Sequence, residues 1–247
     1  MNSRIKLFCF PYGGGMAEYY RKWKKSLHGS IDLHPVELAG RGKRGDEPYY
    51  QSFDEALDDI YSLVSPEITH CRYAFYGHSM GSMLCYELAH RLLADNKPMP
   101  EHIFVSGRGA PNTKHEDDKK ILHTLPDREF IEELYKLGGM PDEILEQQLL
   151  LDFLLPIFRA DFKIIENFNY KDRGKKLPVP ITVFNGKDDN IYFSQLIEWR
   201  NHTDSECKVI NFPGGHFFIN EYYTEIIKLI NHVLVENIKN RILHAIH

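Results

Sequence analysis

The fold of this chain is constrained most by a five-residue stretch, G-H-S-M-G at residues 77–81. A short apolar run at 73–76 precedes it, and apolar residues recur at helical spacing from Met83 to Leu92 after it. The pattern G-x-S-x-G between a strand and a helix is typical of a nucleophile elbow, in which a strained turn exposes the serine hydroxyl. The glycines let neighbouring backbone pass without a Cβ collision, and the N–H groups that open the helix favour developing negative charge. We therefore predict that Ser79 is a nucleophile.

The rest of the chain alternates predicted strands with predicted helices. Such alternation indicates an α/β fold with a mostly parallel central sheet and helices on both faces. A length of 247 residues with 43% hydrophobic content suits one domain, 1–247. Strands are expected at 5–10, 31–38, 73–76, 101–107, 181–185 and 207–212, and helices at 17–27, from 52, after the elbow, at 192–199 and at 222–235.

The alternation stops between about residues 120 and 168. One helical pattern runs from Leu125 and ends at Gly138-Gly139, and a second, strongly apolar one covers 141–168. Helices inserted between the strands of such a sheet are where a lid over an active site is built, and their apolar side chains need either core or substrate to cover them. We predict a mobile lid here, with a packed core insertion as the alternative.

A carboxylate and a histidine follow the last two predicted strands. Asp189 comes just after the strand at 181–185, and His216 lies on a Gly-Gly turn after the strand at 207–212. In α/β sheets, catalytic groups gather at the carboxyl ends of strands, and Ser, Asp, His is the order of a hydrolase triad. A serine needs such a base, and the base needs a carboxylate that holds its tautomer. Asp188 remains the rival to Asp189.

The first strand is followed by a glycine-rich loop, P-Y-G-G-G at 11–15. The loop lacks the spacing of a nucleotide-binding motif. Because glycines have no side chain, the backbone of the loop can approach a ligand closely. An oxyanion hole needs two backbone N–H donors: one follows the nucleophile, and this loop can provide the other. Met80 and Gly13 are the predicted donors, and Tyr12 or Gly14 could take the place of Gly13.

Composition and charge exclude several classes of function. The net charge of −5 is spread along the chain, which argues against nucleic acid as a partner. The four cysteines have no C-x-x-C spacing, so free thiols in a reducing cytoplasm are expected instead of disulfides or a metal site. No signal peptide or membrane-length apolar segment is visible, so no membrane contact is expected. The charged loop at 39–48 is predicted to lie at the surface, where its three basic residues either are solvated or meet a phosphate or an acidic partner.

Several separated motifs span nearly all of the chain. They are F-C-F-P-Y-G-G-G at 8–15, E-L-A-G-R-G-K-R at 37–44, G-H-S-M-G, L-P-D-R-E-F at 125–130, L-G-G-M-P at 137–141, L-P-I-F-R-A-D-F at 155–162 and G-G-H-F-F at 214–218. Together they resemble the motifs of one family, the type II, or external, thioesterases of nonribosomal peptide and polyketide synthesis, and the pieces from the predicted lid are specific to that family. At the position of Gly13 the family usually has Ala, and at that of Ser82 it usually has Gly.

The resemblance implies an α/β-hydrolase fold and a stand-alone repair enzyme. Its partner would be an acyl-loaded phosphopantetheinyl carrier protein, from which it would hydrolyse aberrant or stalled acyl thioesters. Ser79 would attack the thioester, His216 would act as base and Asp189 would orient it. No metal and no bound cofactor is implied, and we expect a monomer. A carboxylesterase or acyltransferase on the same fold, or a catalytically silent binding module, are the alternatives.

Overall fold

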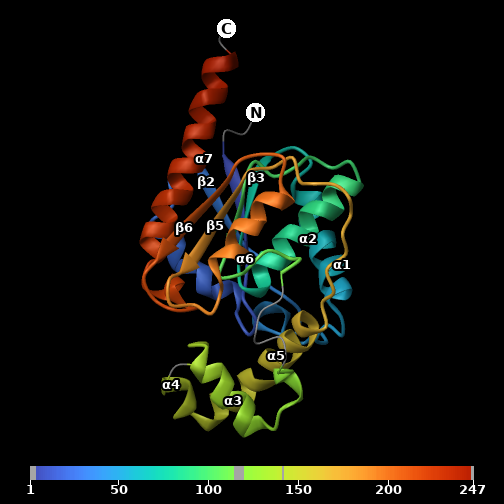
Figure 1. Ribbon diagram of the computed structural model, residues 1–247, viewed down its shortest axis with the longest axis vertical. Coiled ribbons are helices and arrows are strands. Elements are labelled where there is room, and N and C mark those ends of the chain that lie inside the picture. The colour runs from blue at the N-terminus through green and yellow to red at the C-terminus, as the bar shows by residue number, and fades with distance from the viewer. Residues whose placement is uncertain (1–3, 114–119, 141, 246–247) are drawn as a thin grey trace.

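The core of the protein is a parallel six-stranded sheet. The computed structural model describes residues 4–113, 120–140 and 142–245, with side chains as far as 236 (Figure 1). Every neighbouring pair of strands in the order β2-β1-β3-β4-β5-β6 is parallel. The strands are β1 (Ile5–Phe10), β2 (Ile31–Pro35), β3 (Arg72–His78), β4 (Ile103–Ser106), β5 (Ile181–Gly186) and β6 (Cys207–Phe212). The predicted α/β class is confirmed.

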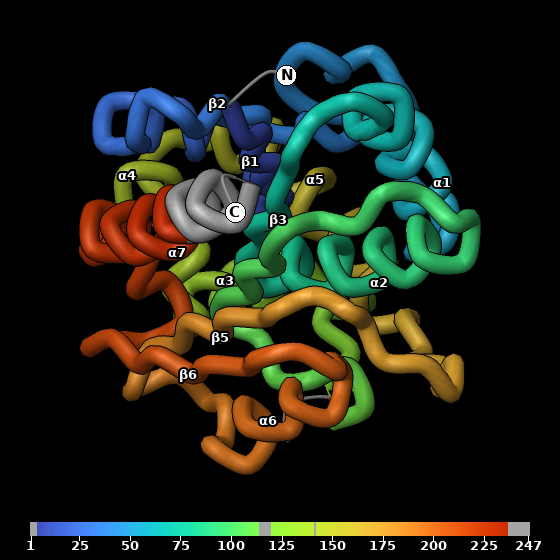
Figure 2. The backbone as a smooth tube through the Cα atoms, turned by 90° about the horizontal axis from the view of Figure 1, so that it is seen from above, coloured from blue at the N-terminus to red at the C-terminus, as the bar shows by residue number. Residues whose placement is uncertain are grey.

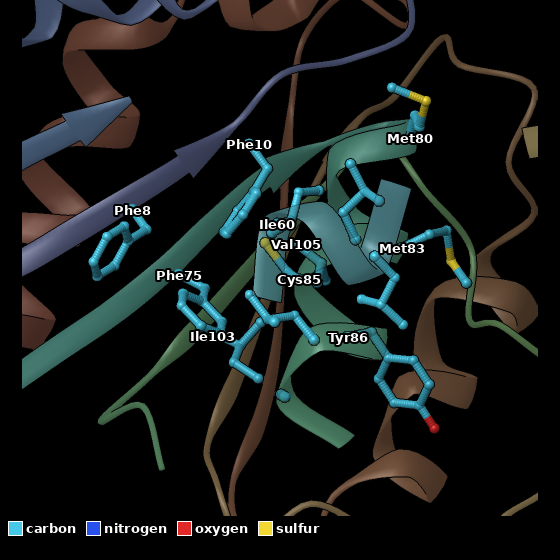
Figure 3. Close-up of a cluster of buried hydrophobic side chains, with 14 of the residues drawn as sticks. Phe8, Phe10, Ile60, Phe75, Met80, Met83, Cys85, Tyr86, Ile103 and Val105 are labelled. Carbon is cyan, nitrogen blue, oxygen red and sulfur yellow. The ribbon is translucent and has the colours of Figure 1, made fainter. Parts of the chain in front are cut away.

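Helices cover both faces of the sheet, on opposite sides in Figure 2. One face carries α1 (Phe53–Val64), α2 (Met80–Ala94) and α6 (Phe193–Ile197), and the other carries η1 (Ala17–Lys25) and α7 (Tyr223–Ala245). Side chains alternate along the strands. Phe8 and Phe75 belong to the buried cluster on the side of α2 (Figure 3), whereas Leu7 and Tyr76 belong to the cluster on the side of α7. Both faces are therefore buried, as a parallel sheet requires.

Local signals explain where several elements begin and end. The Ser52 hydroxyl accepts the Glu55 N–H and caps α1, so this helix begins where it was predicted. The predicted helix at 17–27 is a 3₁₀ helix over Ala17–Lys25. The predicted strand at 31–38 ends at Pro35, although the Val36 N–H still donates to the Cys9 carbonyl of β1 at 2.9 Å. The final helix was predicted to end near 235, but it continues to Ala245. Within the described residues, no helix is both long and apolar enough to cross a membrane.

The inserted segment lies apart from the sheet, at the bottom of Figure 1. It contains α3 (Asp127–Lys136), α4 (Asp142–Leu145) and α5 (Gln148–Glu166), so the predicted second helix is in fact two; Pro141 lies outside the described residues. These helices share a small core of their own, which includes Phe130, Leu134 and Ile157. Leu149 on α5 remains 87% exposed. The apolar residues of the insertion therefore serve partly as core and partly as exposed surface.

The loop at 39–48 was predicted to lie at the surface, and most of residues 42–48 are exposed, but the prediction is wrong for Arg41. Arg41 is only 1% exposed and forms an ion pair with Asp161 of α5. Arg44 is partly buried and pairs with Asp59 and Glu47. Two of the three basic residues of the loop are therefore paired with carboxylates of α5, of α1 and of the loop itself, whereas Lys43 is exposed.

Candidate active site

Ser79 occupies the turn between β3 and α2. Its backbone has φ 53° and ψ −115°, and among the described residues Asn96 is the only other non-glycine residue with a positive φ. A side chain in that region costs about 1–3 kcal/mol, so the surrounding structure must hold it there. The Ser79 N–H donates to the Ser106 carbonyl of β4 at 2.7 Å. The predicted elbow is therefore present, with its serine at the strained position.

The two motif glycines are required by close backbone contacts. A Cβ at Gly77 would lie 2.1 Å from the Gly81 carbonyl oxygen, and a Cβ at Gly81 would lie 2.3 Å from that of Phe10. Neither backbone atom can move aside cheaply. The start of α2 therefore packs directly against the carboxyl end of β1, where the glycine-rich loop begins.

Asp189 and His216 meet at the carboxyl ends of β5 and β6. His216 Nδ1 lies 2.9 Å from Asp189 Oδ2, and the Asp189 side chain is 7% exposed. Asp188 points elsewhere: its carboxylate accepts the Gly214 N–H at 3.2 Å. The structure thus brings Asp189, and not its rival, to the histidine. Ser79 Oγ and His216 make no hydrogen bond in this structure, and such bonds commonly tighten only when substrate is bound.

A second histidine, His78, supports the first. Its ring centroid is 5.0 Å from that of His216, and its Nδ1 lies 2.9 Å from Ser106 Oγ. Burial lowers the pKa of His78 well below its ordinary value, and the nearby His216 charge lowers it further. His78 is therefore neutral at physiological pH, so it adds no second charge beside His216.

The predicted oxyanion donors, Met80 and Gly13, belong to the two segments that pack together, the start of α2 and the loop after β1. Met80 is the first residue of α2, so its N–H has no partner within the helix. In the glycine-rich loop, the Gly14 N–H donates to Asp161 Oδ2 at 2.7 Å and the Gly15 N–H donates to the Tyr12 carbonyl at 2.8 Å. Gly14 is therefore committed, whereas the N–H groups of Gly13 and Tyr12 make no hydrogen bond within the described part of the chain.

The family's usual alanine would fit at the position of Gly13. The nearest atom to a Cβ there would be Phe162 Cε2 at 3.6 Å, an ordinary contact. Ser82, where the family usually has glycine, is buried and accepts the Ser106 N–H at 2.9 Å. Both departures from the family pattern are therefore accommodated, and the second adds a bond between the elbow and β4.

Sequence reasoning missed two buried residues beside this loop, Arg41 and Asp161. Their guanidinium and carboxylate form two parallel hydrogen bonds, of 2.5 and 2.6 Å. Burial alone would lower the pKa of Arg41, but the charge and hydrogen bonds of Asp161 outweigh it and raise that pKa above its ordinary value. Both residues lie in motifs that carried the family resemblance, A-G-R-G and R-A-D-F, and that was the only signal in the sequence.

A cavity of about 350 Å³ opens between the glycine-rich loop, the inserted helices and the residue after His216. A larger groove, of about 860 Å³, lies beside β2 and η1. None of the five predicted site residues lines either hollow, but chain neighbours of Gly13 and His216 line the smaller cavity, which is therefore the nearer of the two to the chemistry. Its lining residues are mainly apolar or glycine: Tyr12, Gly14, Gly15, Met16, Glu18, Tyr19, Gly138, Gly139, Ile144, Leu154, Phe158, Phe217 and Asn220.

Comparison with known proteins agrees with this geometry. The family model of the thioesterase domain matches residues 5–234. The gramicidin S biosynthesis protein GrsT of Aneurinibacillus migulanus is 35% identical over 229 residues, which are 92% of this chain and 88% of GrsT. ClbQ, from the colibactin NRPS/PKS pathway, has a TM-score of 0.89 and 34% identity over 96% of this chain and 99% of its own.

A third relative is a solved type II thioesterase, BorB of the borrelidin biosynthetic cluster. It has a TM-score of 0.83 and 29% identity, and the match covers 93% of this chain and 92% of BorB. Each match includes the inserted helices as well as the sheet, because each covers nearly the whole chain. The resemblance found in the sequence is therefore confirmed, and this chain belongs to the thioesterase family, as a thioester hydrolase on an α/β-hydrolase fold.

Proposed function

We propose that this thioesterase removes aberrant or stalled acyl and aminoacyl groups from the phosphopantetheine arms of carrier proteins in nonribosomal peptide or polyketide synthesis. The observation that carries the proposal is the likeness, over nearly the whole chain, to ClbQ and BorB, which belong to such pathways. The mainly apolar cavity beside His216 supports it, because a short acyl group there would be sheltered from water.

The proposed mechanism assigns one role to each residue of the site. Ser79 attacks the thioester carbonyl while His216 accepts its proton, and Asp189 holds the histidine in the required tautomer. The N–H groups of Met80 and Gly13 stabilise the oxyanion. His216 then protonates the departing thiolate of the arm, and a water molecule activated by the same histidine releases the acid from Ser79.

The proposed partner is an acyl-loaded carrier protein, and the proposed state of the enzyme is a cytoplasmic monomer. All four cysteines are free thiols, which suits a reducing compartment. Light scattering after gel filtration tests the monomer. A molar mass of twice that of the chain would contradict it.

The function is tested with a panel of carrier proteins loaded with different acyl and aminoacyl groups. We expect release of the free acid, detected as the mass of the unloaded carrier, and faster turnover than with the same acyl groups on a small thiol, because the arm and carrier add binding energy. An oxygen ester of the same acid serves as the control for a general esterase. Faster hydrolysis of that ester than of any carrier-bound thioester would contradict the proposal.

We also propose that the insertion, about 120–168, is a lid that opens for the phosphopantetheine arm. The two ends of α5 differ in burial. Asp161 and Ile164 in its later part are buried, whereas Leu149 and Phe153 in its earlier part are exposed. Pro156 lies between them and removes one hydrogen bond of the helix. The moving part is therefore proposed to precede Pro156.

Hydrogen exchange tests the lid. Amides at 127–155 are expected to exchange faster than those of β3 and β4, because few contacts hold them to the sheet, and to become protected when a non-hydrolysable acyl-carrier analogue binds. The carboxyl half of α5 is the internal reference and should change little. Exchange at 127–155 as slow as in the central strands, and unaffected by the analogue, would identify the insertion as structural core.

A further inference from the structure

A buried ion pair joins the inserted helix α5 to the glycine-rich loop. Arg41 and Asp161 are each 1% exposed, and their two hydrogen bonds have the parallel geometry of a strong guanidinium–carboxylate pair. The two residues are 120 positions apart in the sequence. Neither belongs to the triad or to the oxyanion donors, so the proposed mechanism gives them no role.

Both members of the pair also hold the backbone of the loop. Asp161 accepts the Gly14 N–H at 2.7 Å, and Arg41 donates to the Gly15 carbonyl at 3.1 Å. Gly14 has φ +80°, a conformation that a glycine leaves easily unless something fixes it. Phe158 and Phe162 of α5 also pack against this loop, at Gly14 and Gly13. The shape of the loop therefore depends on α5.

These contacts determine the direction of one free N–H group. The Gly15 N–H donates to the Tyr12 carbonyl, which belongs to the same peptide unit as the Gly13 N–H. Because a trans peptide places its N–H and C=O on opposite sides, the Gly13 N–H points away from that bond. The loop thus directs the Gly13 N–H outward while its neighbours at Gly14 and Gly15 are held within the protein.

We infer that Arg41 and Asp161 are positioning residues for thioester hydrolysis: they hold the glycine-rich loop so that the Gly13 N–H faces the oxyanion formed on Ser79, and they make that geometry depend on the seating of α5. The inference rests on the proposed function for its reaction. An oxyanion donor must lie within about 2.7–3.1 Å of the oxygen, so a small displacement of the loop weakens it.

A merely structural pair is the alternative, and the two can be separated. Replacing a buried ion pair by apolar residues of similar volume is often neutral for stability. The double variant Arg41→Met/Asp161→Leu removes both charges together and leaves none buried alone. It also removes the acceptor of the Gly14 N–H. A structural role therefore predicts normal turnover in this variant when it is folded, whereas a positioning role predicts slow turnover.

The experiment measures kcat and KM for a small acyl thioester. In the double variant we expect kcat to fall about 10- to 100-fold with KM within about threefold of wild type, since loss of a whole oxyanion donor costs about 10²–10³ in kcat. The matched control is Arg72→Met/Glu101→Leu, which removes a paired guanidinium and carboxylate at the opposite end of β3 and should leave kcat unchanged. Wild-type kcat in the folded double variant would overturn the inference.

Two further measurements keep the inference testable. If the double variant does not fold, Asp161→Asn replaces it. Its amide oxygen can keep the two bonds that Oδ2 accepts from Gly14 and Arg41, but its amide nitrogen cannot accept from Arg41 Nη2 as Oδ1 does, and the neutral amide no longer balances the guanidinium charge. The loop is then held less firmly, and a smaller fall in kcat is expected. Labelling of Ser79 by a fluorophosphonate needs no thioester, so it reports on the loop even if the wild-type enzyme leaves every carrier-bound acyl group intact and the proposed function fails. A labelling rate in the folded double variant equal to that of the wild type would overturn the inference on its own.

Discussion

Replacing Ser79 with alanine is expected to lower kcat for thioester hydrolysis by about 10⁶-fold, to the residual rate that binding and oxyanion stabilisation alone provide. The fold should be unaffected. Ser79 Oγ makes no hydrogen bond among the described residues, and alanine has the same Cβ as serine, so the strain at φ 53° is unchanged. The release of acid from a loaded carrier measures the rate, and urea denaturation measures the stability.

Ser82→Ala provides the control, because Ser82 lies three residues from Ser79 and its hydroxyl holds the structure together instead of reacting. Its hydroxyl is buried and bonds the backbone of β4. Ser82→Ala leaves the Ser106 N–H without that partner, so we expect about 1–3 kcal/mol less stability together with a triad that still works. Turnover within tenfold of wild type in a folded Ser79→Ala protein would rule out Ser79 as the nucleophile.

The parts of the fold that were predictable from sequence are those determined by neighbouring residues. The glycines at 77 and 81, with a strand before them and a helix after them, were enough to predict the elbow. The contact that requires Gly77 lies within that turn, although the one that requires Gly81 is with the Phe10 carbonyl of β1. Strand β6 was predicted at its observed bounds, since its apolar run ends at a Pro-Gly-Gly turn. The residue facing His216 could only be narrowed to two neighbours, because one residue of slack in a loop leaves no trace in the sequence.

The burial of Arg41 could not be predicted in this way. Its surroundings in the sequence are charged and rich in glycine, which is the composition of a surface loop. What buries it is Asp161, which lies on a helix of the insertion and is distant in sequence. The same holds for the choice among the loop glycines: Gly14 is excluded as an oxyanion donor only because Asp161 accepts its N–H. Both the burial of Arg41 and the exclusion of Gly14 therefore depend on a carboxylate that is distant in the sequence.

Replacing Asp189 with asparagine is expected to lower kcat by about 10⁴-fold, because the amide favours the wrong tautomer of His216 and cannot stabilise the imidazolium. Asp188→Asn is the matched control. It changes a neighbouring carboxylate that is exposed and bonds Gly214, so kcat should change little. If the two variants behave in the reverse order, Asp188 is the residue that orients the histidine.

The double variant Ser79→Ala/Asp189→Asn tests whether Asp189 acts through the triad. Residues that work as a unit are not additive, so the second change should lower the residual rate of Ser79→Ala by far less than it lowers the wild-type rate. The physical basis of this expectation is the 2.9 Å contact in which Asp189 Oδ2 accepts from His216 Nδ1. Once the Ser79 hydroxyl is gone, orienting His216 no longer activates a nucleophile. A further 10⁴-fold loss in the double variant would mean that Asp189 supports catalysis by a route other than the serine and histidine.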